Sequence, residues 1–125
     1  MRRAIALWAP LVLALAAVYW LSSLSQVPGA QYASDKLLHV AGYAGLGLLA
    51  LRAFHGGIAR LRPGPTLAAA ALIVVWGILD EFHQSFVPGR DATASDVVAD
   101  AIGFGLAVVI LAAWTGLARD RATAL

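Results

Sequence analysis

Polar and charged residues recur at helical spacing in three stretches of an otherwise apolar chain. These residues are Asp35, Lys36, His39 and Tyr43; Asp80, Glu81, Gln84 and Arg90; and Asp96 and Asp100. Residues four positions apart share one face of a helix. Asp35, His39 and Tyr43 are spaced in this way, as are Asp80 and Gln84. Each stretch therefore predicts a helix with one polar stripe.

Acids and an imidazole in these stretches could carry out proton transfer. His39, Asp80 and Glu81 are the candidate catalytic residues, because carboxylates and imidazoles are the usual general acids and bases of enzymes. The sequence contains no H-E-x-x-H motif, no G-x-S-x-G motif and no phosphate-binding glycine loop. These residues therefore leave open whether the protein is an enzyme.

The same stretches offer ligands for a cation and for an anion. Asp35, Asp80 and Asp96 could hold Mg²⁺ or another hard cation, because such cations prefer carboxylate oxygens. Arg90 and Lys36 could contact a phosphate or carboxylate group of a ligand. Alternatively, the sole role of Arg90 could be to form an ion pair with Asp96 or Asp91.

The composition shows what kind of protein must position these residues. Of 125 residues, 61% are hydrophobic and 13% are charged, and the mean hydropathy is +0.79. Soluble domains have about 25% charged residues. The composition excludes a disordered segment, a coiled coil and a basic nucleic-acid-binding module. The absence of cysteine excludes disulfides and thiolate metal sites. An integral membrane protein remains.

Four runs without Asp, Glu, Lys or Arg predict four membrane spans. The runs cover residues 4–21, 37–51, 66–79 and 101–118. A bilayer core of about 30 Å requires roughly 20 helical residues. We therefore expect transmembrane helices at about residues 4–23, 36–54, 66–85 and 97–118. The predicted fold is an all-α, four-transmembrane-helix bundle that forms a single domain over residues 1–125.

The second and third apolar runs are too short to cross the bilayer core alone. At about 1.5 Å per residue, the third span must continue through Asp80 and Glu81, and the second must include His39. Asp80 and His39 would then lie roughly 8–10 Å below the membrane boundary. Charged groups that face acyl chains cost a few kcal/mol each, so they turn toward the bundle interior. We expect the stripes to converge on an outward-opening polar pocket, with Lys36 and Arg90 at its mouth.

The basic residues predict the orientation of the chain. With the N-terminus inside, the inner segments hold seven of the nine basic residues: Arg2, Arg3, Arg52, Arg60, Arg62, Arg119 and Arg121. Only Lys36 and Arg90 lie on the outer side. Because basic residues are retained on the cytoplasmic side, both termini are predicted to be cytoplasmic. The polar stripes then lie near the outer face.

The order and spacing of the polar residues resemble the VanZ-like family of small bacterial membrane proteins. The residues that carry the resemblance are Asp35-Lys36-x-x-His39-x-x-x-Tyr43, Asp80-Glu81-x-x-Gln84-x-x-x-x-x-Arg90, and Asp96 followed by Gly103. The likeness covers almost the whole chain. The family's usual asparagine near the start of the last helix is Asp100 here.

The resemblance implies a location and a biological setting. It implies a multi-pass protein of the bacterial cytoplasmic (inner) membrane that is associated with the cell envelope. The family takes its name from a member in glycopeptide-antibiotic gene clusters, which is associated with teicoplanin resistance. Most members lie outside such clusters, so the resemblance predicts no resistance role for this chain, and it implies no established biochemical activity.

Three hypotheses about function follow. The first is a binding or modulatory protein whose partner is an envelope lipid, its head group or a small polar ligand. The second is a membrane enzyme that acts on a phosphorylated envelope lipid, with or without a divalent cation. The third is a purely structural role, in which the polar side chains satisfy one another and fix the helix register. None involves nucleic acid, and the sequence does not indicate an oligomeric state.

Other residues are expected to have structural roles only. Five glycines suit close contact between membrane helices: Gly42, Gly45, Gly47, Gly103 and Gly105. His55 and Asp91 are expected on the solvated surface.

Overall fold

The protein is a bundle of four long helices. A computed structural model describes residues 1–28 and 30–123, although the side chains of residues 30 and 119–123, and with them those of Arg119 and Arg121, lie outside the description. The helices are α1 (Arg2–Ser22), α2 (Asp35–His55), α3 (Pro63–Gln84) and α4 (Ala94–Thr123), with a short 3₁₀ turn, η1 (Ala30–Tyr32), before α2. The described residues contain no strand. The all-α prediction is confirmed.

Each of the four helices is long and apolar enough to span a membrane. In α4 this holds for the segment Ala94–Ala118. Three of the helices are 21 or 22 residues long, which corresponds to about 30 Å at 1.5 Å per residue. The chain is therefore a multi-pass membrane protein, as the apolar runs predict.

Local sequence explains where the middle helices begin and end. The Ser34 hydroxyl accepts a hydrogen bond from the Leu37 N–H and caps the start of α2. α2 ends at Gly56, whose φ of 74° lies in the left-handed region that glycine adopts without strain. Pro63 opens α3 at a position where no N–H is required.

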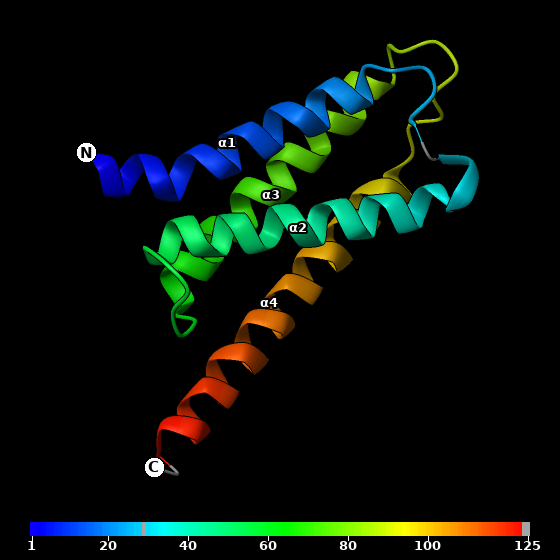
Figure 1. The fold of residues 1–125 in the computed structure, drawn as a ribbon. Helices are drawn as coiled ribbons and strands as arrows, with labels where there is room; N and C mark the ends of the chain where they lie inside the picture. Colours follow the sequence, from blue (N-terminus) through cyan, green and yellow to red (C-terminus); the bar gives the residue numbers. More distant parts are fainter. Residues whose placement is uncertain (29, 124–125) are drawn as a thin grey trace.

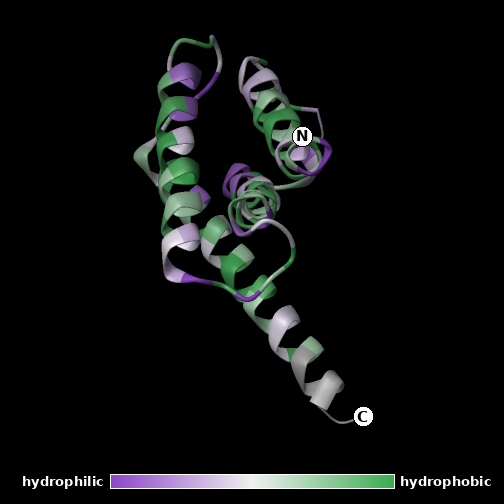
Figure 2. Cartoon of the chain, turned by 90° about the vertical axis from the view of Figure 1, so that its left-hand side faces the viewer, coloured by the Kyte–Doolittle hydropathy of each residue, from purple (hydrophilic) through white to green (hydrophobic). Residues whose placement is uncertain are grey.

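Successive helices run in opposite directions (Figure 1). Consequently, residues 23–28, 30–34 and 85–93 lie at one end of the bundle, which we call the polar end. The N-terminus and the segment 56–62 lie at the other. α2 is central: it packs against each of the other helices and most extensively against α4. The C-terminal half of α4 extends away from the other helices in both views (Figures 1 and 2).

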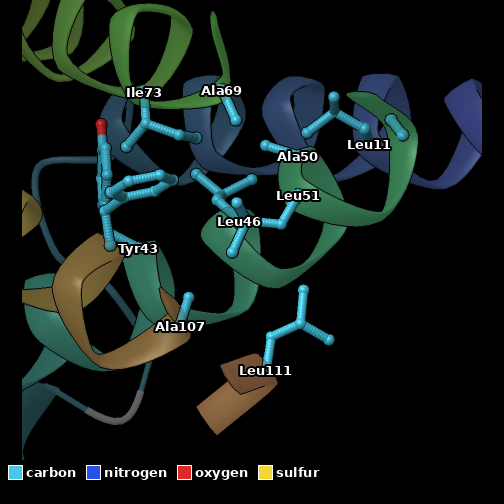
Figure 3. Close-up of a cluster of buried hydrophobic side chains, with 11 residues drawn as sticks. Leu11, Tyr43, Leu46, Ala50, Leu51, Ala69, Ile73, Ala107 and Leu111 are labelled. Carbon is cyan, nitrogen blue, oxygen red and sulfur yellow. The ribbon is translucent and has the colours of Figure 1, made fainter. Parts of the chain in front are cut away.

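An apolar core lies between the helices, below the polar end. Figure 3 shows side chains from all four helices meeting in this core, with Leu11 of α1, Leu51 of α2, Ile73 of α3 and Leu111 of α4 among them. Tyr43 belongs to the same cluster and is 2% exposed. Many large hydrophobic side chains are instead exposed, as expected for contact with lipid. Figure 2 shows that hydrophobic residues recur along the helices.

Two glycines allow α2 and α4 to approach closely. A Cβ on Gly103 would lie 2.5 Å from the Val40 carbonyl oxygen and 2.9 Å from the Ala44 nitrogen. A Cβ on Gly47 would lie 2.8 Å from the Ala107 Cβ. The prediction of close helix contact is wrong at three further glycines. A Cβ would meet nothing within 4 Å at Gly42, Gly45 or Gly105.

His55 corrects a second expectation. It is only 7% exposed rather than solvated. Its Nδ1 lies 2.9 Å from the Leu51 carbonyl oxygen, and its Nε2 accepts a hydrogen bond of 3.0 Å from the Arg62 N–H. The imidazole therefore joins the end of α2 to the start of α3. Asp91 is exposed, as expected.

Candidate functional site

The structure brings the three polar stripes together at the polar end of the bundle. Five of the ten predicted site residues are buried acids or amides of α3 and α4: Asp80, Glu81, Gln84, Asp96 and Asp100. His39 and Tyr43 of α2 are buried beside them. Arg90 is half-buried, and Asp35 and Lys36 lie at the exposed rim. The ten residues form two connected groups.

The first group surrounds His39. The imidazole Nδ1 lies 2.8 Å from Asp100 Oδ1. The other ring nitrogen, Nε2, lies 3.9 Å from Asp35 Oδ2 and 3.9 Å from Glu81 Oε1. His39 thus links the last helix to the third helix through its two ring nitrogens.

Thr93 holds two carboxylates of this group side by side. Its N–H donates to Glu81 Oε2 at 3.0 Å and to Asp96 Oδ2 at 3.2 Å. Its hydroxyl donates to Asp96 Oδ2 at 2.7 Å. The Lys36 ammonium forms an ion pair with Asp96 Oδ1 and lies 3.2 Å from the Thr93 hydroxyl. The start of α4 therefore fixes Glu81 and Asp96 together.

The second group surrounds Asp80. The Ser22 hydroxyl donates to Asp80 Oδ1, and the Gln84 amide donates to Asp80 Oδ2 at 3.1 Å. The Tyr43 hydroxyl is 3.5 Å from the same oxygen. Gln84 Oε1 in turn accepts from Arg90 Nε at 3.2 Å and from Arg90 Nη2 at 2.5 Å. The chain of contacts runs from α1 through α3 to the segment before α4.

The two groups meet at Tyr43 and Gly77. The Tyr43 ring is stacked near His39, with 6.4 Å between the ring centroids. A Cβ on Gly77 would lie 2.8 Å from Asp100 Oδ2 and 3.5 Å from the Tyr43 ring. Glycine at this position is therefore what leaves room for the Asp100 carboxylate between α3 and α4.

Two buried carboxylate oxygens in the site have no hydrogen-bond partner among the described residues. They are Glu81 Oε1 and Asp100 Oδ2. An unsatisfied buried polar atom costs about 1–3 kcal/mol. Such atoms are rare in folded proteins and require an explanation. In a purely structural network, the side chains of the site would satisfy one another's hydrogen bonds. Here two carboxylate oxygens lack a partner in the described part of the chain, which favours a site that binds something else.

A cavity enters the bundle beside these groups. It has a volume of about 140 Å³ and lies between α1, α2 and α3. Its walls combine apolar side chains, among them Val18, Leu21 and Leu38, with polar ones, among them Tyr43 and Asp80.

A wider hollow of about 670 Å³ lies at the polar end, and its walls include Ser25, Gln31 and Asp91. Four residues line both spaces: Val27, Asp35, Gln84 and Arg90. These shared residues place the cavity and the hollow next to each other, with Arg90 lining both.

Sequence reasoning missed two residues of the site. Ser22 is buried at the end of α1 and contacts Asp80, and nothing in the sequence marks this serine. Thr93 did have a signal, because Thr-x-x-Asp before an apolar run is a variant of the capping box. The Thr93 N–H contact with Asp96 has the geometry of that box.

The ion pair predicted between Arg90 and Asp96 or Asp91 does not form. Asp96 pairs with Lys36 instead, and no carboxylate of the described residues lies within 4.0 Å of the Arg90 guanidinium. The predicted Mg²⁺ ligands Asp35, Asp80 and Asp96 do not all lie together. Asp80 lies in the second group, and the residues whose ligand atoms lie together are Asp35, His39 and Asp96.

Comparison with known proteins gives a family. The family model VanZ/LLP1 matches residues 5–115. No curated protein and no solved structure matches the chain. Because the family model covers most of the 125 residues, and because the polar residues that carry the resemblance lie within the matched range, the chain belongs to the VanZ/LLP1 family.

Proposed function

We propose that this protein binds the anionic head group of an envelope amphiphile in the cavity at its polar end. In this proposal the protein lies in the bacterial cytoplasmic membrane with the polar end outward. The uneven distribution of Lys and Arg residues supports that orientation. The ligand is a lipid-like molecule whose head group carries a phosphate or a carboxylate.

The state of Arg90 is the observation that carries this proposal. Its Nε and Nη2 both donate to one acceptor, Gln84 Oε1. A guanidinium has five N–H donors, so the remaining donors are available to another partner. Arg90 is half-buried between the cavity and the outer hollow, and no described carboxylate neutralises it. Phosphate and carboxylate groups match this geometry best.

The apolar wall of the cavity supports an amphiphile rather than a free anion. Val18 and Leu21 of α1 and Leu38 of α2 line the same space as Arg90. α1 has only two buried residues, Leu11 and Ser22, so it covers this side of the cavity loosely. An acyl or polyprenyl chain would pack against these side chains while its head group reaches Arg90.

A second candidate function is hydrolysis of a phosphorylated envelope lipid. The observation that favours it is the arrangement of His39, with Asp100 on Nδ1 and the unpartnered Glu81 Oε1 near Nε2. A carboxylate that orients an imidazole is a common general-base arrangement. Release of inorganic phosphate from an alkyl phosphate would favour this second function over simple binding.

Binding of monododecyl phosphate tests the proposal. We expect the purified protein in uncharged detergent to bind it, and Arg90→Gln to weaken binding at least about tenfold, the effect of losing one charge-assisted contact. Isothermal titration calorimetry measures both. Arg62→Gln is the matched control, because Arg62 is exposed at the opposite end of the bundle. An unchanged affinity in Arg90→Gln, or an equal loss of affinity in Arg62→Gln, would refute the proposal.

The orientation predicts which engineered cysteines are accessible from outside. The chain has no cysteine, so single replacements give a clean signal. A cysteine at Ala92 should react with a membrane-impermeant maleimide in intact cells. A cysteine at Ile58, which is 66% exposed at the opposite end, should react only after the membrane is permeabilised. The reverse pattern would invert the proposed topology.

A further inference from the structure

Three side chains of the His39 group place their ligand atoms close together. One ligand atom each from Asp35, His39 and Asp96 lies within 4.8 Å of the others. Two carboxylates and an imidazole are a common donor set for a divalent metal ion. Acids that gather at a surface do not by themselves make a metal site, so a second observation is needed.

Glu81 supplies the second observation. Its side chain is more than nine-tenths buried, and Oε1 has no hydrogen-bond partner among the described residues. That oxygen lies 3.9 Å from His39 Nε2, while Oε2 is held by the Thr93 N–H. The same N–H donates to Asp96 Oδ2, so the Glu81 and Asp96 carboxylates are held next to each other. An unsatisfied carboxylate oxygen therefore points toward the cluster.

The histidine is oriented as a metal ligand would be. His39 Nδ1 is occupied by Asp100 Oδ1 at 2.8 Å, which leaves Nε2 facing Asp35 and Glu81. In metal sites the second nitrogen of a ligating histidine usually bonds a carboxylate in this way, and that contact fixes the ring orientation. Asp100 is buried and so holds the ring firmly.

A cation already occupies the edge of this cluster. The Lys36 ammonium pairs with Asp96 Oδ1 and lies 3.9 Å from Asp35 Oδ2. The Lys36 side chain is 47% exposed, and its long flexible stem would let the ammonium move to solvent. A metal ion bound to Asp96 would compete with Lys36 for this carboxylate.

We infer that Asp35, His39, Glu81 and Asp96 form a binding site for a divalent transition-metal ion of the Zn²⁺ type. One imidazole nitrogen and several carboxylate oxygens suit Zn²⁺, whereas Mg²⁺ and Ca²⁺ prefer oxygen ligands alone. This inference goes beyond the proposed head-group binding and does not depend on it. Arg90, which carries that proposal, lies in the Asp80 group.

Titration of the purified protein with Zn²⁺ tests the inference. We expect wild type to bind one Zn²⁺ per chain, and His39→Gln to weaken binding at least about tenfold, as loss of a metal-site contact does. Lys36→Met should bind Zn²⁺ more tightly than wild type, because the competing ammonium is gone. Asp91→Asn is the matched control: it removes an exposed acid at the same end of the bundle and should leave the affinity unchanged.

Co²⁺ provides a spectroscopic readout that does not depend on any activity. Bound Co²⁺ should show the visible absorption of a site with nitrogen and oxygen ligands, and His39→Gln should abolish it. If His39→Gln does not fold, the increased affinity of Lys36→Met still tests the inference independently.

Several results would overturn the metal site. They are the absence of Zn²⁺ binding by both wild type and Lys36→Met, unchanged binding in a folded His39→Gln, equal loss in Asp91→Asn, or equal competition by Mg²⁺. Arg90→Gln should bind Zn²⁺ as wild type does. Failure of the metal site and failure of head-group binding are therefore distinguishable.

Discussion

Replacing Gly103 by alanine is expected to destabilise the bundle by about 3 kcal/mol, the upper end of the usual cost of overpacking. The added Cβ would lie 2.5 Å from the Val40 carbonyl oxygen and 2.9 Å from the Ala44 nitrogen. Both are backbone atoms of α2 and cannot rotate away as a side chain would. α2 and α4 would have to separate, and they form the most extensive helix contact in the protein.

Gly105→Ala is the matched control for this prediction. Gly105 lies two residues further along α4, and a Cβ there meets nothing within 4 Å. Alanine is a better helix former than glycine by up to about 1 kcal/mol, so this variant should be as stable as wild type or more stable. Equilibrium unfolding in mixed detergent micelles measures both variants. Equal stabilities for the two alanine variants would contradict the close contact between α2 and α4 at Gly103.

Replacing Asp80 by alanine is expected to cost at least about 2 kcal/mol of unfolding free energy. Asp80 is 4% exposed and accepts hydrogen bonds from Ser22, Gln84 and, at 3.5 Å, Tyr43. Its removal leaves the Gln84 amide and the Tyr43 hydroxyl without this acceptor, whereas the Ser22 hydroxyl can still donate to the Val18 carbonyl oxygen at 2.5 Å. Each unsatisfied buried group costs about 1–3 kcal/mol. The same mixed-micelle unfolding measurement reports the loss.

Asp35→Ala provides the comparison for Asp80→Ala, because it makes the same chemical change at the same end of the bundle. The Asp35 side chain is 56% exposed, and its contacts with Lys36 and His39 are both 3.9 Å long. Exposed ion pairs contribute about 0–1 kcal/mol, so Asp35→Ala should change stability by no more than that. A stability loss in Asp35→Ala as large as that in Asp80→Ala would contradict the assignment of Asp80 as the central acceptor.

The overall fold could be predicted from the sequence because the bilayer imposes one strong constraint. Four apolar runs require four helices, and the short runs at residues 37–51 and 66–79 require polar residues to enter the spans. The 3.6-residue helix period then places His39 and Asp80 on definite helix faces. The structure shows both residues buried between helices.

The partners within the site could not be predicted in the same way, because they depend on the rotation of each helix about its axis. Helical spacing puts Gly103 and Gly105 on nearly opposite faces of α4, but no sequence pattern says which face meets α2. Lys36 and Arg90 are both long enough to reach Asp96, and the position of the segment before α4 decides that Lys36 does so. A single serine at the end of an apolar run, Ser22, carries no signal of its partner.

The two proposals divide the polar end into two adjoining sites. The His39 group has acidic oxygens and one exposed-rim lysine, and it suits a metal cation. The Asp80 group ends at Arg90, which suits an anion. Asp35 belongs to the first group and also lines the cavity, so both sites face one space. A metal ion beside Arg90 would add a second positive charge for a phosphate head group.

The accessibility of a cysteine at Gly42 shows whether water enters the cavity between α1, α2 and α3 from the polar end of the bundle. Gly42 lines this cavity, about 10 Å along α2 from Asp35, and a Cβ there meets nothing within 4 Å. Gly45 has equal space at its Cβ but does not line the cavity, so Gly45→Cys is the matched control.

The measurement is the rate at which an anionic, membrane-impermeant methanethiosulfonate reagent, added outside, modifies each cysteine. We expect modification of Gly42→Cys, slower modification when Arg90→Gln is added, and no modification of Gly45→Cys. If Gly42→Cys proves as unreactive as Gly45→Cys while a cysteine at Ala92 reacts, no aqueous path reaches Tyr43 and Asp80 from outside, and the proposed binding cavity does not exist.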